Sequence, residues 1–171
     1  MVGHSVGAYY CQGLAERRPS RVAGFALVCP LVDGIRDVPE HRPVLTCHDI
    51  GDEEFRGYFV VHTPEMLERF ERFVAPAIPL VDAEAMERIG RHWQLSPTGG
   101  RAYTGPTLVV AGRQDSTVGY AAAVDLLRRY PLATLVVMDG AGHALPHEKP
   151  EALAMLVQDW LDRAKADARP R

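Results

Sequence analysis

A serine stands between two glycines at the start of the chain, in the sequence Gly3-His4-Ser5-Val6-Gly7. This G-x-S-x-G pattern is typical of a tight turn from a strand into a helix, with the serine side chain projecting from the turn. We expect small residues at Gly3 and Gly7 to let strand and helix approach closely. Because amides at a helix N-terminus lack partners, the backbone N–H of Val6 is a candidate oxyanion donor. The pattern indicates a nucleophilic Ser5, although a helix N-cap serine also satisfies it.

A carboxylate and an imidazole follow two apolar segments further along the chain. Asp115 comes shortly after the apolar segment 107–111, and His143 follows the segment 134–138 across two glycines. A carboxylate that orients an imidazole, and an imidazole that takes a serine proton, form a nucleophile assembly. Each residue alone is more typical of an ordinary turn or loop. Their combination predicts covalent catalysis by Ser5, Asp115 and His143.

Three short segments have the almost continuous apolar character of strands that are covered on both faces of a parallel sheet. They are 22–29, 107–111 and 134–138. Helical patterns lie beside them at 6–18, at 120–130 and from Pro150 onward. Strands that alternate with helices predict an α/β fold, in which the carboxyl ends of the strands form the ligand-binding edge.

The stretch 31–104 interrupts this alternation. It contains several prolines and two amphipathic helical patterns, 64–74 and 82–93, the second with Asp82 as a candidate N-cap. We therefore predict a core made of 1–30 and 105–171, with 31–104 as a cap or lid inserted over the sheet.

Composition excludes several classes of protein. With 47% hydrophobic and 24% charged residues, the chain matches a soluble globular domain. A net charge of −3 argues against a nucleic-acid partner, and no apolar segment is long enough to predict a membrane span. Three cysteines without a C-x-x-C pair favour reduced thiols in a cytoplasmic protein. His143 and His147 have a metal-like spacing, but Pro146 makes a helix there improbable, so no metal site is predicted.

Three segments together resemble the α/β-hydrolase family in its serine hydrolase branch. They are GHSVG at 3–7, TLVVAGRQD at 107–115 and GAGHALPHEKPE at 140–151. The resemblance implies that Ser5 is the nucleophile, His143 the general base and then acid, and Asp115 the orienting acid. It also matches Glu148 and Pro150 to residues that often open the final helix of the family. It covers about 1–30 and 105–171.

The resemblance implies cleavage of an ester, thioester, lactone or amide of a small-molecule substrate, through an acyl-enzyme on Ser5. No cofactor or metal is implied. Carbon–carbon bond hydrolases, cofactor-free haloperoxidases and iminopeptidases share the same triad and stay open. A non-catalytic alternative is a hydrolase-like remnant or a ligand-binding module.

The start of the chain departs from the family pattern. Only Met1 and Val2 precede Gly3, so we expect this sequence to lack the strand that leads into the turn and the upstream loop with a second oxyanion amide. We expect a truncated fold, the C-terminal part of a longer hydrolase, with the 22–29 strand as an exposed edge. A homo-oligomer or a complementing chain that supplies the missing strands stays open.

Overall fold

The computed structural model of the chain describes residues 1–95 and 103–167. At its centre lies a four-stranded parallel sheet in the order β1-β2-β5-β6. These strands are β1 (Val2–His4), β2 (Phe25–Val28), β5 (Thr107–Gly112) and β6 (Ala133–Met138). The three predicted strands are therefore present, and the α/β fold with a parallel sheet is confirmed.

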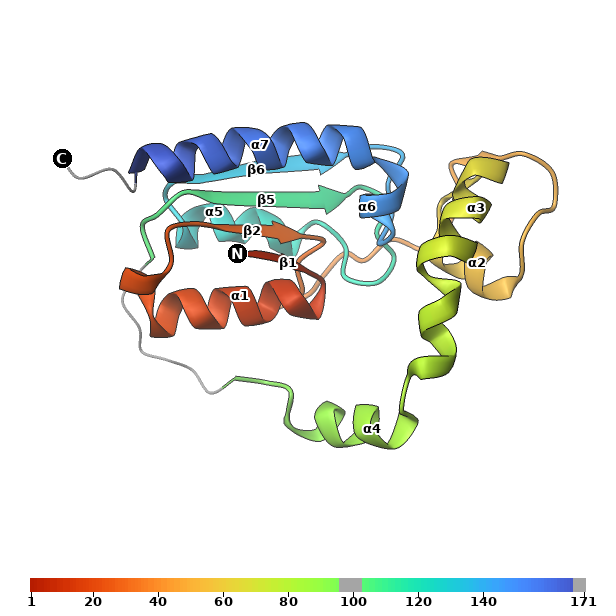
Figure 1. Cartoon of the computed structure of the whole chain (residues 1–171), viewed down its shortest axis with the longest axis horizontal. Helices are drawn as coiled ribbons and strands as arrows, with labels where there is room; N and C mark the ends of the chain where they lie inside the picture. Colours follow the sequence, from red (N-terminus) through yellow and green to blue (C-terminus); the bar gives the residue numbers. More distant parts are fainter. Residues whose placement is uncertain (96–102, 168–171) are drawn as a thin grey trace.

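Helices cover both faces of the sheet (Figure 1). On one face lie α1 (Val6–Arg17) and α5 (Leu126–Arg129), which follows the 3₁₀ helix η3 (Ala122–Asp125); on the other lies α7 (Pro150–Asp167). Side chains alternate along β2, so that Phe25 and Leu27 join the first core while Ala26 and Val28 join the second. The two central strands are buried throughout, which explains their unbroken apolar sequence.

The helices bury their apolar side chains to different extents. In α7 an apolar stripe packs against the sheet; its members are Leu153, Leu156, Val157, Trp160 and Leu161. In the 120–130 region, however, Val124 and Leu127 are exposed. The first part of that region is a 3₁₀ helix, which has three residues per turn and so turns Leu126 inward instead.

Within its described residues, 31–95 and 103–104, the 31–104 stretch contributes no strand to the central sheet. Its elements are β3 (Leu45–Thr46), α2 (Glu53–Tyr58), β4 (Val61–His62), α3 (Pro64–Phe73), the 3₁₀ helix η2 (Ala75–Leu80) and α4 (Ala83–His92). The Asp82 side chain accepts a hydrogen bond from the Ala85 amide at 2.9 Å, as predicted for an N-cap. In Figure 1, α2 and α3 of this stretch lie beyond the carboxyl ends of the strands, and α4 lies on the same side of the sheet as α1.

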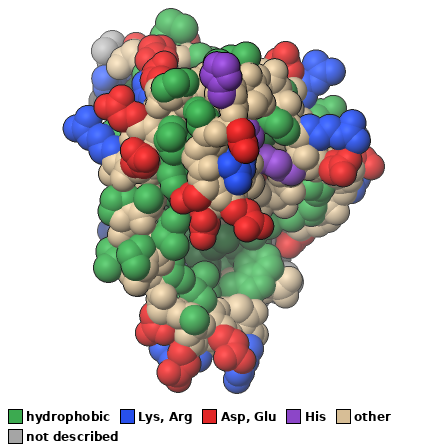
Figure 2. All heavy atoms as spheres, turned by 90° about the vertical axis from the view of Figure 1, so that its right-hand side faces the viewer, with side chains coloured by type: hydrophobic (Ala, Val, Ile, Leu, Met, Phe, Trp, Pro, Cys, Tyr) green, Lys and Arg blue, Asp and Glu red, His purple; other side chains and the backbone are tan. Residues whose placement is uncertain are grey.

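Two parts of the 31–104 stretch differ in packing. A small core joins α2 and α3 to the loop after β6; its buried members are Phe55, Phe59, Met66, Phe70 and Ala144. By contrast, α4 has no buried residue, and large hydrophobic side chains around it are exposed. They are Phe73, Ile78, Leu80, Val81, Met86 and Ile89. Figure 2 shows hydrophobic side chains in and around a hollow on this side of the molecule.

The start of the chain differs from the prediction. Residues 2–4 do form a short strand, β1, which pairs in parallel with β2 and places Gly3 opposite Leu27. The expectation that the 22–29 strand is an exposed edge is therefore wrong, since β2 lies between β1 and β5. The three-residue strand β1 is enough to pair with β2 because Met1 extends the pairing: its carbonyl accepts a hydrogen bond from the Ala26 amide at 2.8 Å.

Pro146 does not prevent a helix. The four-residue helix α6 (Leu145–Glu148) has this proline in its first turn, where a missing N–H costs nothing. The expectation of no helix at Pro146 is therefore wrong, but His143 precedes α6, so His143 and His147 do not lie within one helix. None of the helices in 1–95 and 103–167 is both long and apolar enough to cross a membrane.

The glycines of the first turn have unequal roles. A Cβ on Gly3 would lie 2.4 Å from the carbonyl oxygen of Gly7, which is closer than non-bonded atoms approach. A Cβ on Gly7 would meet nothing within 4 Å. The close approach of β1 and α1 therefore needs glycine at position 3 only, whereas we expected it at both.

We predict that Gly3→Ala lowers the free energy of unfolding by about 1–3 kcal/mol, because the added carbon meets backbone atoms. The matched Gly7→Ala variant should be neutral or up to about 1 kcal/mol more stable, because alanine favours helix. Urea unfolding of both variants beside the wild type checks this. Equal losses from the two substitutions would contradict the assignment.

Candidate active site

Ser5 occupies a strained turn between β1 and α1. Its backbone lies at φ 53° and ψ −120°, in the left-handed half of conformational space that residues other than glycine rarely adopt. Backbone hydrogen bonds hold it there: the Ser5 amide donates to the Val28 carbonyl at 3.0 Å, and its carbonyl accepts from the amides of Ala8 at 3.0 Å and Leu31 at 3.3 Å. The half-buried side chain therefore stands at the N-terminus of α1, where Val6 is the first helical residue.

Asp115 follows β5 and is fully buried. Its Oδ1 accepts hydrogen bonds from the amides of Thr117 at 2.9 Å and Val118 at 3.0 Å. Its Oδ2 lies 2.9 Å from Nδ1 of His143. Burial acts to raise the pKa of Asp115, but these hydrogen bonds and the attraction to the imidazole outweigh it and hold the pKa below its usual value. The carboxylate therefore stays ionised at neutral pH.

His143 lies in the loop after β6 with its side chain largely buried. An ionised carboxylate only accepts hydrogen bonds, so the proton of a neutral imidazole sits on Nδ1 and the lone pair on Nε2. The structure thus brings together two of the three predicted residues. Within the described residues no hydrogen bond joins the Ser5 hydroxyl to the His143 ring. Such bonds are often long before substrate binds.

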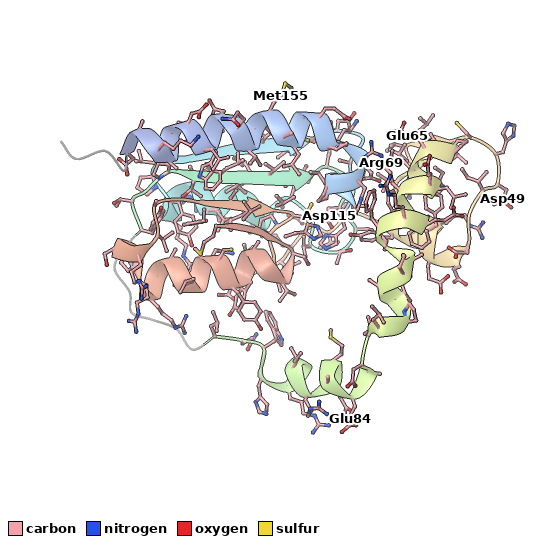
Figure 3. All side chains as sticks on the ribbon, in the orientation of Figure 1. Asp49, Glu65, Arg69, Glu84, Asp115 and Met155 are labelled. Atoms are coloured by element: carbon pink, nitrogen blue, oxygen red, sulfur yellow. The ribbon has the colours of Figure 1, made fainter. Side chains whose placement is uncertain are left out.

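The loops that carry Asp115 and His143 are fastened to each other. The Gln114 amide donates to the Ala141 carbonyl at 3.0 Å, and the Ala141 amide donates to Oε1 of Gln114 at 3.2 Å. A Cβ on Gly112 would lie 2.5 Å from the Ala141 carbonyl oxygen, so glycine allows the close approach. The Asp115–His143 distance is therefore set by backbone contacts as well as by the side chains. Figure 3 labels Asp115 at the end of the sheet that faces α2 and α3.

A second carboxylate, that of Glu148 in α6, connects the histidine loop to the 31–104 stretch. One oxygen accepts a hydrogen bond from the Gly142 amide at 2.7 Å, and the other accepts from the Val60 amide at 2.7 Å. Burial raises the pKa of Glu148 above its usual value, although these bonds act against the shift. The family resemblance singled out this residue from the sequence, but the contact with Val60 has no local sequence signal.

Three further side chains contact the histidine or its loop. Nε2 of His4 lies 2.9 Å from the His143 carbonyl oxygen, and the two rings are 4.8 Å apart. The rings of Tyr58 and His143 pack edge to face with their centroids 6.3 Å apart, and burial raises the pKa of Tyr58 to about 12. The Cys29 thiol donates to the Gly142 carbonyl at 3.6 Å. Burial, followed by the nearby His143, lowers the pKa of His4, so its imidazole is mostly neutral at pH 7.

The family of the chain follows from comparison with known proteins. The model of the alpha/beta hydrolase family matches residues 1–156, and the chain belongs to that family. The fold is similar to that of an alpha/beta superfamily hydrolase from Oenococcus oeni PSU-1, with a TM-score of 0.86 at 20% sequence identity. That match covers 96% of this chain and 66% of the other.

Two further solved structures show the same fold at lower similarity. A membrane phospholipase A described as a bacterial virulence factor has a TM-score of 0.64 at 23% identity, covering 96% of this chain and 56% of that one. A serine hydrolase involved in carbazole degradation has a TM-score of 0.62 at 19% identity, covering 94% and 62%. The chain thus spans less than two thirds of the length of these three structures. A search of curated proteins finds no match.

We predict that Glu148→Gln lowers the free energy of unfolding by about 1–3 kcal/mol, because an amide cannot accept hydrogen bonds on both sides. Urea unfolding measures the loss. Amide hydrogen exchange should also show faster exchange at Gly142 and Val60. The matched control is Glu68→Gln, which removes the same charge from an exposed position on α3. If both variants unfold alike, Glu148 does not fasten the two loops.

Proposed function

We propose that this chain carries the active site of a serine hydrolase, with Ser5 as nucleophile, His143 as general base and acid, and Asp115 as the orienting acid. The observation that carries the proposal is the 2.9 Å contact between the buried Asp115 carboxylate and Nδ1 of His143. It leaves the Nε2 lone pair of His143 available at the same sheet edge as the strained Ser5 turn.

The reaction would proceed in two halves. The Ser5 oxygen attacks the substrate carbonyl while its proton passes to Nε2 of His143, and the Val6 N–H donates to the oxyanion that forms. His143 then gives the proton to the leaving group, and the bond between that group and the carbonyl carbon breaks. Water hydrolyses the acyl-enzyme in the second half with His143 acting as base again. No cofactor or metal takes part.

We further propose that 31–104 acts as a cap over a small-molecule substrate, with 1–30 and 105–171 as the core. Its helices α2 and α3 lie beyond the carboxyl ends of the strands, the edge that carries Ser5, Asp115 and His143. The large hydrophobic side chains exposed around α4, and the hydrophobic side chains in and around the hollow in Figure 2, favour an apolar acyl group. An ester, thioester, lactone or amide fits this chemistry. Such a protein would act in the cytoplasm, alone or with a further chain.

One observation favours a second candidate, a non-catalytic ligand-binding module: within the described residues, no hydrogen bond joins the Ser5 hydroxyl to the His143 ring. Measured turnover separates the two candidates, because a binding module retains ligand without hydrolysing it.

We predict that the chain hydrolyses p-nitrophenyl acyl esters and that Ser5→Ala removes this activity. Asp115→Asn should lower kcat by about 10³–10⁴-fold, because the amide favours the wrong tautomer of His143. Ser20→Ala serves as the matched serine control and should hydrolyse as the wild type does. Hydrolysis that survives Ser5→Ala would contradict the assignment of the nucleophile.

A further inference from the structure

Three side chains able to bind a metal meet beside the proposed catalytic centre. They are His4 at the end of β1, Cys29 directly after β2 and His143 in the loop after β6. Each offers one ligand atom, and these atoms all lie within 4.8 Å of one another. The proposed hydrolysis needs only His143 from this group, so the other two side chains have no role in that reaction.

The backbone directs Cys29 into this cluster. The register of β1 and β2 places His4 opposite Val28, so Cys29 is the first residue past the paired strands. Its φ of 43° is unfavourable for any residue except glycine, and the hydrogen bond from its amide to Val110 at 2.8 Å holds that conformation. The thiol lies against the Gly142 carbonyl and is fully buried. A conformation of this kind persists only where the surroundings determine it.

The donor types select the kind of ion. Thiolate sulfur and imidazole nitrogen are the ligands that Zn²⁺ prefers, and sites with three protein ligands keep a fourth position for water. The Asp115 carboxylate on Nδ1 of His143 reproduces the carboxylate–histidine arrangement that orients imidazole ligands in zinc sites. Because this contact occupies Nδ1, Nε2 is the nitrogen of His143 that is left to bind an ion.

We propose that His4, Cys29 and His143 form a Zn²⁺ site. Tetrahedral zinc with bonds of about 2.0–2.3 Å places its ligand atoms about 3.5 Å apart, so binding draws atoms that now lie within 4.8 Å of one another together by up to about 1.3 Å. The Cys29 sulfur binds as thiolate, and its proton is released to solvent as the Zn–S bond forms. No electron is transferred.

Zinc at this site would inhibit the hydrolase. The Nε2 lone pair of His143 that binds zinc is the one that would accept the Ser5 proton, so the two events exclude each other. This consequence rests on the proposed function, whereas the binding itself does not.

Co²⁺ as a spectroscopic probe tests the binding, on the full chain without an affinity tag. One Co²⁺ per chain should produce a thiolate-to-metal charge-transfer band, and one equivalent of Zn²⁺ should abolish it. Cys29→Ser should remove the band, and His4→Gln should raise the Kd for Co²⁺ at least tenfold. Cys47→Ser, which alters a half-exposed thiol outside the cluster, should leave band and Kd unchanged.

The absence of a band in the wild type would overturn the proposal, as would a band that survives Cys29→Ser or disappears in Cys47→Ser. Circular dichroism reports whether Cys29→Ser folds. If it does not fold, the Kd of the His4→Gln variant for Co²⁺ decides, since His4 is only half-buried.

The inhibitory consequence has its own readout, the rate at which a fluorophosphonate labels Ser5 with and without saturating Zn²⁺. Labelling that is absent under both conditions contradicts the proposed function, while the Co²⁺ band still supports the metal site. Labelling that Zn²⁺ does not slow, in a protein that shows the band, refutes inhibition.

Discussion

A fully buried carboxylate is the constraint on which the site depends. Removing an ionised group from water is costly unless hydrogen bonds replace its hydration, and Asp115 receives two backbone amides and the His143 ring. Satisfying these bonds fixes the turn after β5, since Thr117 and Val118 supply the amides. It also fixes the loop after β6, which must bring the imidazole to the carboxylate. The geometry of the acid and the histidine thus follows from the burial of one charge.

The surrounding contacts keep those loops in place. Gln114 and Ala141 join the two loops through one backbone hydrogen bond and one to the Gln114 side chain, and Glu148 joins the histidine loop to Val60 in the 31–104 stretch. The same stretch is held by the small core around Phe55 and Ala144. These hydrogen bonds and this core therefore hold the histidine loop against α2 and α3. By contrast, α4 has no buried residue, and its apolar side chains are exposed.

Much of this could be predicted from sequence, and the remainder has a common physical reason. The strands 107–111 and 134–138 and the α7 stripe are local patterns that report burial directly. The order of Ser5, Asp115 and His143 predicted their arrangement at one edge. Contacts of Tyr58 and Cys29 with the histidine or its loop join residues far apart in sequence, so no local pattern encodes them. The open space around Gly7, which would accommodate a Cβ, depends on tertiary surroundings that the local sequence does not encode. Whether Pro146 is compatible with a helix depends on its exact position in that helix.

The central claim is that the Asp115–His143 pair makes Ser5 a nucleophile, and covalent labelling with a fluorophosphonate probe tests it most directly. The intact mass of the labelled chain should rise by one probe adduct, and peptide sequencing should place that adduct on Ser5. Labelling should be much slower in Asp115→Asn, in which Ser5 itself is unchanged. An adduct on another residue, or no adduct on a folded chain, would contradict the account.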